Sequence, residues 1–149
     1  MELLVCRSPK AAKQYEIEET IECGMVLKGS EVKSLRQRRA DLEGAYAVVS
    51  QGELFLHKMH IAPYEQGGPY FNHEPKRTRK LLAKRHEIQK LQGRLTTRGY
   101  TLVPLQCYFK SGVAKVQLGL GKGRKTHDNR ESIKRKQDLR EAREAVKNR

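Results

Sequence analysis

The last 29 residues of the chain set the strongest limit on what it can fold into. From Gly121 to Arg149 there are eleven Lys or Arg residues against five Asp or Glu, and large apolar side chains are few. Such a segment cannot bury enough apolar surface to offset the entropy lost on ordering, so we expect it to be disordered when free. The sequence therefore predicts one folded domain, residues 1–120, followed by a basic C-terminal tail, residues 121–149.

The tail also has the composition of a helix that forms on a partner. After Asn129 it is rich in good helix formers, and opposite charges such as Glu131 and Arg135 stand at helical spacing. A basic segment that is disordered alone and helical on a polyanion is a common means of binding RNA. The alternative is a solvated tail that only aids solubility.

The overall charge makes a polyanion the expected partner. The net charge is +14 and the sequence pI is about 9.9, which favours nucleic acid first and an anionic membrane surface second. No window approaches eighteen consecutive apolar residues, and the N-terminus lacks the basic region and cleavage site of a signal peptide. Three cysteines without zinc-type spacing predict a protein of the reducing cytoplasm. We expect no metal site and no cofactor.

The first half of the chain predicts strands around one short helix. Residues 15–23 alternate between apolar and acidic or polar side chains, which indicates a half-buried strand. Ser30 is a plausible N-cap for a helix that ends near Ala40. Residues 44–50 and 53–62 predict two strands joined by a hairpin turn at Gln51-Gly52. The expected apolar face of the first strand carries Tyr15, Ile17, Ile21 and Cys23.

The second half begins with a strongly basic block. Residues 76–90 hold seven Lys or Arg and one Glu, and the spacing of the apolar residues predicts an amphipathic helix with breaks near Ala83 and Gly93. Dense charge on one side favours RNA contact over a merely solvated face. Residues 100–110 and 113–120 predict a second hairpin, with an edge position or a bulge at Pro104.

These elements predict a mainly β fold with helices: a small antiparallel barrel of the OB type, flanked by two to three helices and followed by the tail. Catalysis is not expected. The glycine-rich stretch 118–125 has no Ser or Thr after its Lys and indicates a flexible hinge into the tail rather than a phosphate loop. The acidic residues of strand 15–23 lie on a solvated face, where pairing with Lys or Arg explains them. A generic duplex-RNA-binding protein and an RNA-processing enzyme remain as alternatives.

Several local strings resemble one known family, the SsrA-binding (SmpB) proteins, which partner tmRNA in bacterial trans-translation. The similarity runs from about Lys10 to about Arg140. It is carried by YEIEET at 15–20, GSEVKSLR at 29–36, PKRTRKLL at 75–82, GYTLVPL at 99–105, LGL with Lys122-Gly123, and the tail residues His127, Asp128 and Arg130.

The resemblance implies a mechanism without a catalysed reaction. A barrel of the OB type would bind the tRNA-like domain of tmRNA in place of a D-stem. The tail would enter the empty decoding site and mRNA channel of a stalled ribosome and become helical there, which leads to ribosome release and peptide tagging. Elongation factor Tu and alanyl-tRNA synthetase would be partners through charged tmRNA.

Three departures from the family pattern affect this expectation. Asn129 stands where the family usually has Lys, which weakens one phosphate contact. Gly121 stands where Ala is usual, which is expected to loosen the hinge. The approach segment 8–14 differs from the family's basic pattern, so the contacts of that segment do not carry over.

The resemblance also assigns residues. Glu22 would accept hydrogen bonds from base edges or 2′-OH groups, the alternative being a surface Glu paired with Arg. Basic side chains would contact phosphates and give affinity with little sequence choice. In the tail, His127 could stack on a ribosomal RNA base and Arg130 could bridge phosphates. The expected tmRNA-binding residues are Tyr15, Glu22, Gly24, Glu31, Lys33, Arg36, Arg77, Arg79, Lys80, Leu82, Lys84 and Lys122. The expected ribosome-binding residues of the tail are Gly123, Arg124, Lys125, His127, Asp128, Arg130, Ile133, Lys134 and Arg135.

Overall fold

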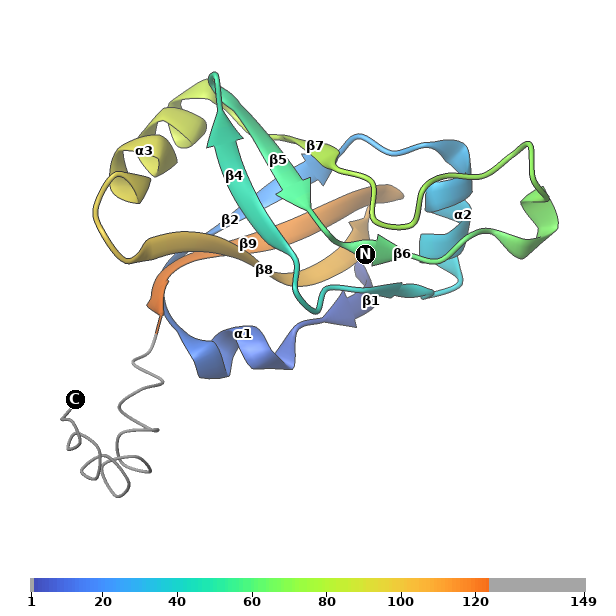
Figure 1. Ribbon diagram of the computed structural model, residues 1–149, viewed down its shortest axis with the longest axis horizontal. Helices are drawn as coiled ribbons and strands as arrows, with labels where there is room; N and C mark the ends of the chain where they lie inside the picture. The colour runs from blue at the N-terminus through green and yellow to red at the C-terminus, as the bar shows by residue number, and fades with distance from the viewer. Residues whose placement is uncertain (1, 124–149) are drawn as a thin grey trace, which may run out of the picture.

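Antiparallel strands arranged in a ring form the body of the protein, with helices around it (Figure 1). The structure is a computed structural model, and it describes residues 2–123. The elements are β1 (Glu2–Arg7), α1 (Pro9–Gln14), β2 (Tyr15–Met25), α2 (Gly29–Arg36), β3 (Ala40–Asp41), β4 (Tyr46–Ser50), β5 (Glu53–His57), β6 (His60–Ile61), the 3-10 turn η1 (Glu65–Gly67), β7 (Arg79–Leu82), α3 (Arg85–Leu95), β8 (Tyr100–Lys110) and β9 (Val113–Gly123).

The main sheet closes into a barrel. Its strand order is β1-β8-β4-β5-β7-β2-β9, and the additional pairing of β8 with β9 completes the ring. All of these pairings are antiparallel. The predicted fold class, a small antiparallel barrel of the OB type with flanking helices, is confirmed.

Both predicted hairpins are present. Gln51 and Gly52 join β4 to β5 with φ values of 52° and 78°, and Ser111 and Gly112 join β8 to β9 with 51° and 80°. Two successive positive φ values are the mark of a type I′ turn, whose twist matches that of the strands. The predicted irregularity at Pro104 is also confirmed, because the register of β8 against β9 shifts between Pro104 and Gln106.

Leucine side chains from the barrel strands and from the helices fill the interior. The fully buried side chains include those of Leu54, Leu56, Leu102 and Leu118. Ile88 and Leu91 of α3 join the same cluster, so this helix covers one side of the barrel with its apolar stripe.

The predicted alternation of half-buried and exposed side chains along the first strand is present, but its two halves do not share one face. The register of β2 against β9 shifts between Ile17 and Glu19, which is a β-bulge. A bulge reverses the side-chain alternation beyond it. Ile21 therefore pairs with buried Leu118, whereas Ile17 covers Gly119, where an added Cβ would lie 3.0 Å from the Ile17 side chain.

The basic block is a strand followed by a helix, not one helix. Residues 79–82 alternate buried, exposed, buried, exposed and pair with β5, and α3 begins only at Arg85. The predicted break near Ala83 is thus the boundary between the two elements. Burial of Leu81 against the barrel outweighs the helical spacing of the apolar residues.

Other predicted boundaries move as well. The helix α2 begins at Gly29 and ends at Arg36, and Arg38 beyond it has φ of 60°. The predicted strand 53–62 is interrupted at Lys58, where φ is 66°. The sequence did not predict β1 or α1.

The last strand runs past the predicted domain boundary and through the predicted hinge. Gly121, Lys122 and Gly123 pair with Ile17, Glu16 and Tyr15. At Gly121 an added Cβ would lie 2.4 Å from the Glu16 carbonyl oxygen, so this glycine permits close approach of two backbones. The expectation that Gly121 loosens a hinge is wrong within the described residues.

Candidate nucleic-acid interface

One outer face of the barrel brings four of the expected site residues together. Glu22 and Gly24 are two positions apart on β2 and share a face, as do Lys80 and Leu82 on β7. Gly24 pairs directly with Leu82, which is 52% exposed, and an added Cβ at Gly24 would lie 3.5 Å from Leu82 Cβ. The glycine therefore leaves room for an exposed leucine on the face that Glu22 also occupies.

Glu22 is held from one side by groups that sequence reasoning missed. The Tyr108 hydroxyl donates to Glu22 Oε2, and Lys110 Nζ lies 3.6 Å from the same oxygen. No described residue lies within hydrogen-bond distance of Oε1. The Tyr108 hydrogen bond is the main cause that lowers the pKa of Glu22, with the charges of Lys110 and Lys115 adding to it. Burial, together with the Glu22 contact, raises the pKa of Tyr108. This face thus presents an ionised carboxylate with one open oxygen.

Glu31 and Arg79 do not lie on that face. Both side chains are completely buried, and Arg79 Nε donates to Glu31 Oε2 at 2.7 Å. The rest of the Arg79 guanidinium donates to the carbonyls of Met59 at 2.6 Å and Pro75 at 3.0 Å. The expectation that these two residues contact RNA is wrong for this structure, because a phosphate has no access to either side chain.

This buried pair fastens α2 to the barrel. Arg77 Nη2 donates to Glu31 Oε1 at 2.6 Å, and the Lys28 backbone N–H donates to the same oxygen at 2.8 Å. Burial would raise the pKa of Glu31, but the hydrogen bonds of Arg77 and Lys28 and the charge of Arg79 outweigh it, so this pKa is lowered. Burial lowers the pKa of Arg79, with Glu31 acting against that shift. Arg77 remains 27% exposed, so part of its guanidinium is accessible.

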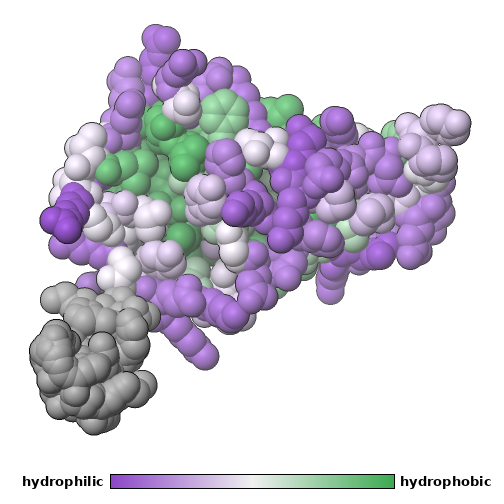
Figure 2. Space-filling model, in the orientation of Figure 1, coloured by the Kyte–Doolittle hydropathy of each residue, from purple (hydrophilic) through white to green (hydrophobic). Residues whose placement is uncertain are grey.

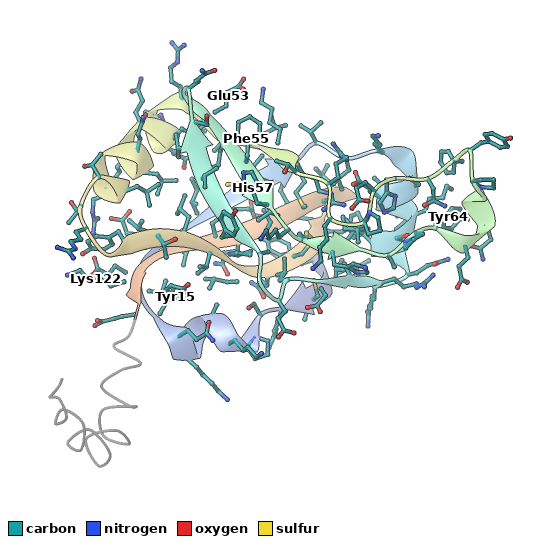
Figure 3. The ribbon with its side chains drawn as sticks, viewed as in Figure 1. Tyr15, Glu53, Phe55, His57, Tyr64 and Lys122 are labelled. Atoms are coloured by element: carbon teal, nitrogen blue, oxygen red, sulfur yellow. The ribbon has the colours of Figure 1, made fainter. Side chains whose placement is uncertain are left out.

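The remaining expected cations are exposed but lie in separate places. Lys33 and Arg36 are on α2, where Lys33 Nζ lies 5.9 Å from the centre of the Tyr64 ring and the Arg36 guanidinium 5.1 Å from that of Phe109. Lys84 precedes α3 and is exposed. Lys122 is near the end of β9, at the opposite end of the long axis from α2 (Figures 1 and 3).

The end of β9 forms a second group with the start of β2. Tyr15, half-buried, pairs with Gly123, the last described residue, and Figure 3 shows Tyr15 and Lys122 near this end. Lys122 Nζ lies 5.3 Å from the centre of the Tyr100 ring, whose hydroxyl donates to Glu18 at 2.9 Å. The other expected tail residues, Arg124 to Arg135, lie outside the described residues.

Glu18 and Glu19 of β2 are paired within the protein, as the simpler interpretation of the sequence predicted. Arg94 of α3 donates to Glu18 at 2.8 Å and to Glu19 at 2.5 Å.

In the part of the chain that the structure describes, no group of three or more His, Cys, Asp or Glu is placed to hold a metal ion. No helix of residues 2–123 is both long enough and apolar enough to cross a bilayer.

Comparisons with known proteins agree with this architecture. A profile of the SmpB protein family matches residues 5–148. The SsrA-binding protein of Geobacillus thermodenitrificans is 53% identical over 146 residues, covering 98% of this chain and 94% of its own. That of Geobacter metallireducens is 51% identical over 148 residues, covering 99% and 96%. That of Bacillus subtilis is 52% identical over 144 residues, covering 97% and 92%.

Solved structures include a similar fold. A chain from the structure described as "tmRNA-SmpB: a journey to the center of the bacterial ribosome" superimposes with a TM-score of 0.71 at 46% sequence identity, covering 86% of this chain and 93% of that one. The family profile and the relatives match nearly the whole chain, and a solved chain shares the barrel fold. The chain therefore belongs to the SmpB family of SsrA-binding proteins.

Proposed function

We propose that this protein binds tmRNA through the tRNA-like domain of that RNA and acts in trans-translation. The relatives are named SsrA-binding proteins, and the similar solved chain comes from a tmRNA–SmpB ribosome structure. The observation that carries the proposal is the outer face on which Glu22, Gly24, Lys80 and Leu82 lie together. It combines an ionised acceptor, an exposed apolar side chain and a cation.

Each group of this face has a separate task in recognition. Glu22 Oε1 accepts a hydrogen bond from a base edge or a 2′-OH, because Tyr108 and Lys110 already hold Oε2. Lys80, Lys84 and the exposed part of Arg77 contact phosphates. Lys33, Arg36 and Lys122 extend the cationic surface to both ends of the barrel.

The tail provides the second half of the proposed function. The barrel delivers tmRNA to a stalled ribosome, and the tail, with His127, Asp128 and Arg130, enters the empty decoding site and mRNA channel. Its eleven cations in 29 residues suit an RNA-lined channel. The protein itself catalyses no reaction; elongation factor Tu and alanyl-tRNA synthetase act through charged tmRNA in the cytoplasm.

A shortened chain tests the division of labour between barrel and tail. A chain that ends at Gly123 keeps every pairing of β9 with β2, whereas a cut before Lys122 would remove two of them. We expect the 1–123 chain to bind tmRNA within a few-fold of the full chain and to tag no peptide in a stalled-translation assay. The control is a chain that lacks only its last two residues. Tagging by the 1–123 chain at the control's rate would contradict the role of the tail.

A further inference from the structure

A partly apolar, aromatic surface continues the Glu22 face across the barrel. Cross-strand partners share a face, and the register places Tyr46 beside His57 and Val48 beside Phe55, which in turn lies beside Lys80. We name the outward side chains of these strands, Tyr46, Val48, Phe55, His57, Lys80 and Leu82, the stacking face. Figure 3 shows Phe55 and His57 in line along β5, and Figure 2 shows hydrophobic residues gathered over β4 and its neighbours.

Two aromatic rings of this face, those of Tyr46 and His57, are already held in place. The Tyr46 and His57 rings are stacked, with centroids 5.3 Å apart and planes inclined by 11°. Thr78 Oγ1 and His57 Nδ1 share a hydrogen bond of 3.2 Å, which sets the orientation of the imidazole. Tyr46 is 38% exposed, and Phe55 and His57 are half-buried. The Tyr46–His57 pair therefore has little conformational entropy left to lose when a flat group stacks on it.

The charges around the face select its occupant. Lys80 Nζ contacts Glu53 Oε2 at 2.9 Å, but both side chains are about half exposed, so this ion pair contributes little and Lys80 can turn to a phosphate. Lys84 and Arg85 follow β7 after one residue, Ala83. In a chain of net charge +14, aromatic rings bordered by cations suit a nucleotide better than an apolar protein segment.

We propose that the stacking face binds an unpaired nucleotide of RNA, with its base on Phe55 and the Tyr46–His57 pair and its phosphate on Lys80. The inference rests on the proposed RNA binding and names a contact that lies beyond the Glu22 group. The base must be unpaired because the bases of an A-form helix are stacked on one another and leave no face for a side chain. The two central strands of an OB-type barrel are a general surface for such contacts.

The test uses the full chain and a labelled single-stranded RNA nonamer, an abasic nonamer of the same length, and a blunt RNA duplex. The variants are Phe55→Leu and Tyr46→Leu, which keep apolar bulk and lose the aromatic ring. Tyr70→Leu is the matched control, because Tyr70 is 99% exposed on the loop after η1. Circular dichroism verifies that every variant is folded.

We expect each stacking-face variant to bind the nonamer about tenfold more weakly than the Tyr70 control. The slope of log K against log salt should not change, because no cation is removed. Binding to the abasic nonamer and the duplex should be the same for all variants. Equal binding of variants and control to the nonamer, or an abasic nonamer bound as tightly as the intact one, would overturn the proposal. Neither result touches the proposed function, which is measured separately on folded tmRNA.

Discussion

Two glutamates nine residues apart, Glu22 and Glu31, lie in opposite environments. Glu22 lies on the surface with one oxygen held by Tyr108, whereas Glu31 is buried between two arginines. Both have a lowered pKa, but for different reasons: a hydroxyl donor in one case, and cationic partners that overcome burial in the other. The same residue type therefore has a proposed role in RNA binding at one site and a structural role at the other.

Glu22→Gln should weaken tmRNA binding about tenfold or more, because the new side chain loses a charged acceptor. The free energy of unfolding should change by less than about 1 kcal/mol, since Glu22 is exposed. Fluorescence anisotropy with labelled tmRNA measures the first and urea unfolding the second. The matched control is Glu43→Gln, which removes another exposed ion-paired carboxylate, 2.6 Å from Lys10. Normal affinity in the Glu22 variant would remove Glu22 from the interface.

Glu31→Gln should destabilise the barrel by about 3–5 kcal/mol, because it leaves buried Arg79 without its counter-charge. Chemical denaturation of the variant and of wild type gives the difference. Glu53→Gln, which removes the exposed partner of Lys80, is the control and should cost less than about 1 kcal/mol. Similar small losses in both variants would show that the buried pair contributes little.

Acid should act through the same buried carboxylate. The pKa of Glu31 in the folded protein lies below its ordinary value of 4.5, so the folded state binds the proton less readily than the unfolded chain. The stabilisation is therefore complete above about pH 4.5 and is lost as the pH falls through the folded pKa. The free energy of unfolding, followed from pH 6 to pH 3, should fall more steeply for wild type than for Glu31→Gln. If the free energy of unfolding fell equally steeply with pH in both proteins, groups other than Glu31 would cause the acid sensitivity.

At the level of single residues, the sequence predicted charge but not burial. The string PKRTRKLL identified a cationic segment, yet only the strand register shows that Arg79 points inward and Lys80 outward. Likewise Tyr108 and Lys110 stand at alternate positions of a predicted strand, but nothing local to the sequence places them beside Glu22, 86 residues from Tyr108. Such partners depend on long-range pairing.

At the scale of elements, hairpins were predictable and the basic block was not. The Gln51-Gly52 and Ser111-Gly112 turns are read from two adjacent residues, because only a few residue pairs adopt two positive φ values. In residues 79–95, strand and helix follow each other within a few residues, and the apolar residues fit either period. The choice of strand for 79–82 depends on the neighbouring strand β5.

Gln51→Asn should stabilise the protein by about 0.5–1 kcal/mol, because asparagine tolerates the left-handed conformation that Gln51 adopts at φ of 52°. The melting temperature should rise accordingly. Gln89→Asn is the control: it makes the same change on the exposed side of α3, where asparagine is the poorer helix former and should lower stability slightly. A fall in stability at position 51 would contradict the I′ turn.

At the scale of the whole molecule, the charges are spread around the barrel rather than gathered in one cleft. The helix α2 lies at one end of the long axis and the end of β9 at the other, with the Glu22 face and the stacking face on the strands between them (Figure 1). A surface that presents contacts on several sides suits a protein that must touch two large RNAs at once. The pairing of β9 up to Gly123 fixes where the tail begins relative to these faces.

The proposed function requires that the barrel recognises the tRNA-like domain of tmRNA and is more than a polycation. The most direct measurement is an anisotropy titration of the full chain with that domain, with an elongator tRNA and with a generic RNA hairpin, each at two salt concentrations. Binding to the tRNA-like domain should be tightest and should persist at the higher salt, because the hydrogen bond that Glu22 accepts does not depend on counterion release. Equal and steeply salt-dependent binding to all three RNAs would contradict it.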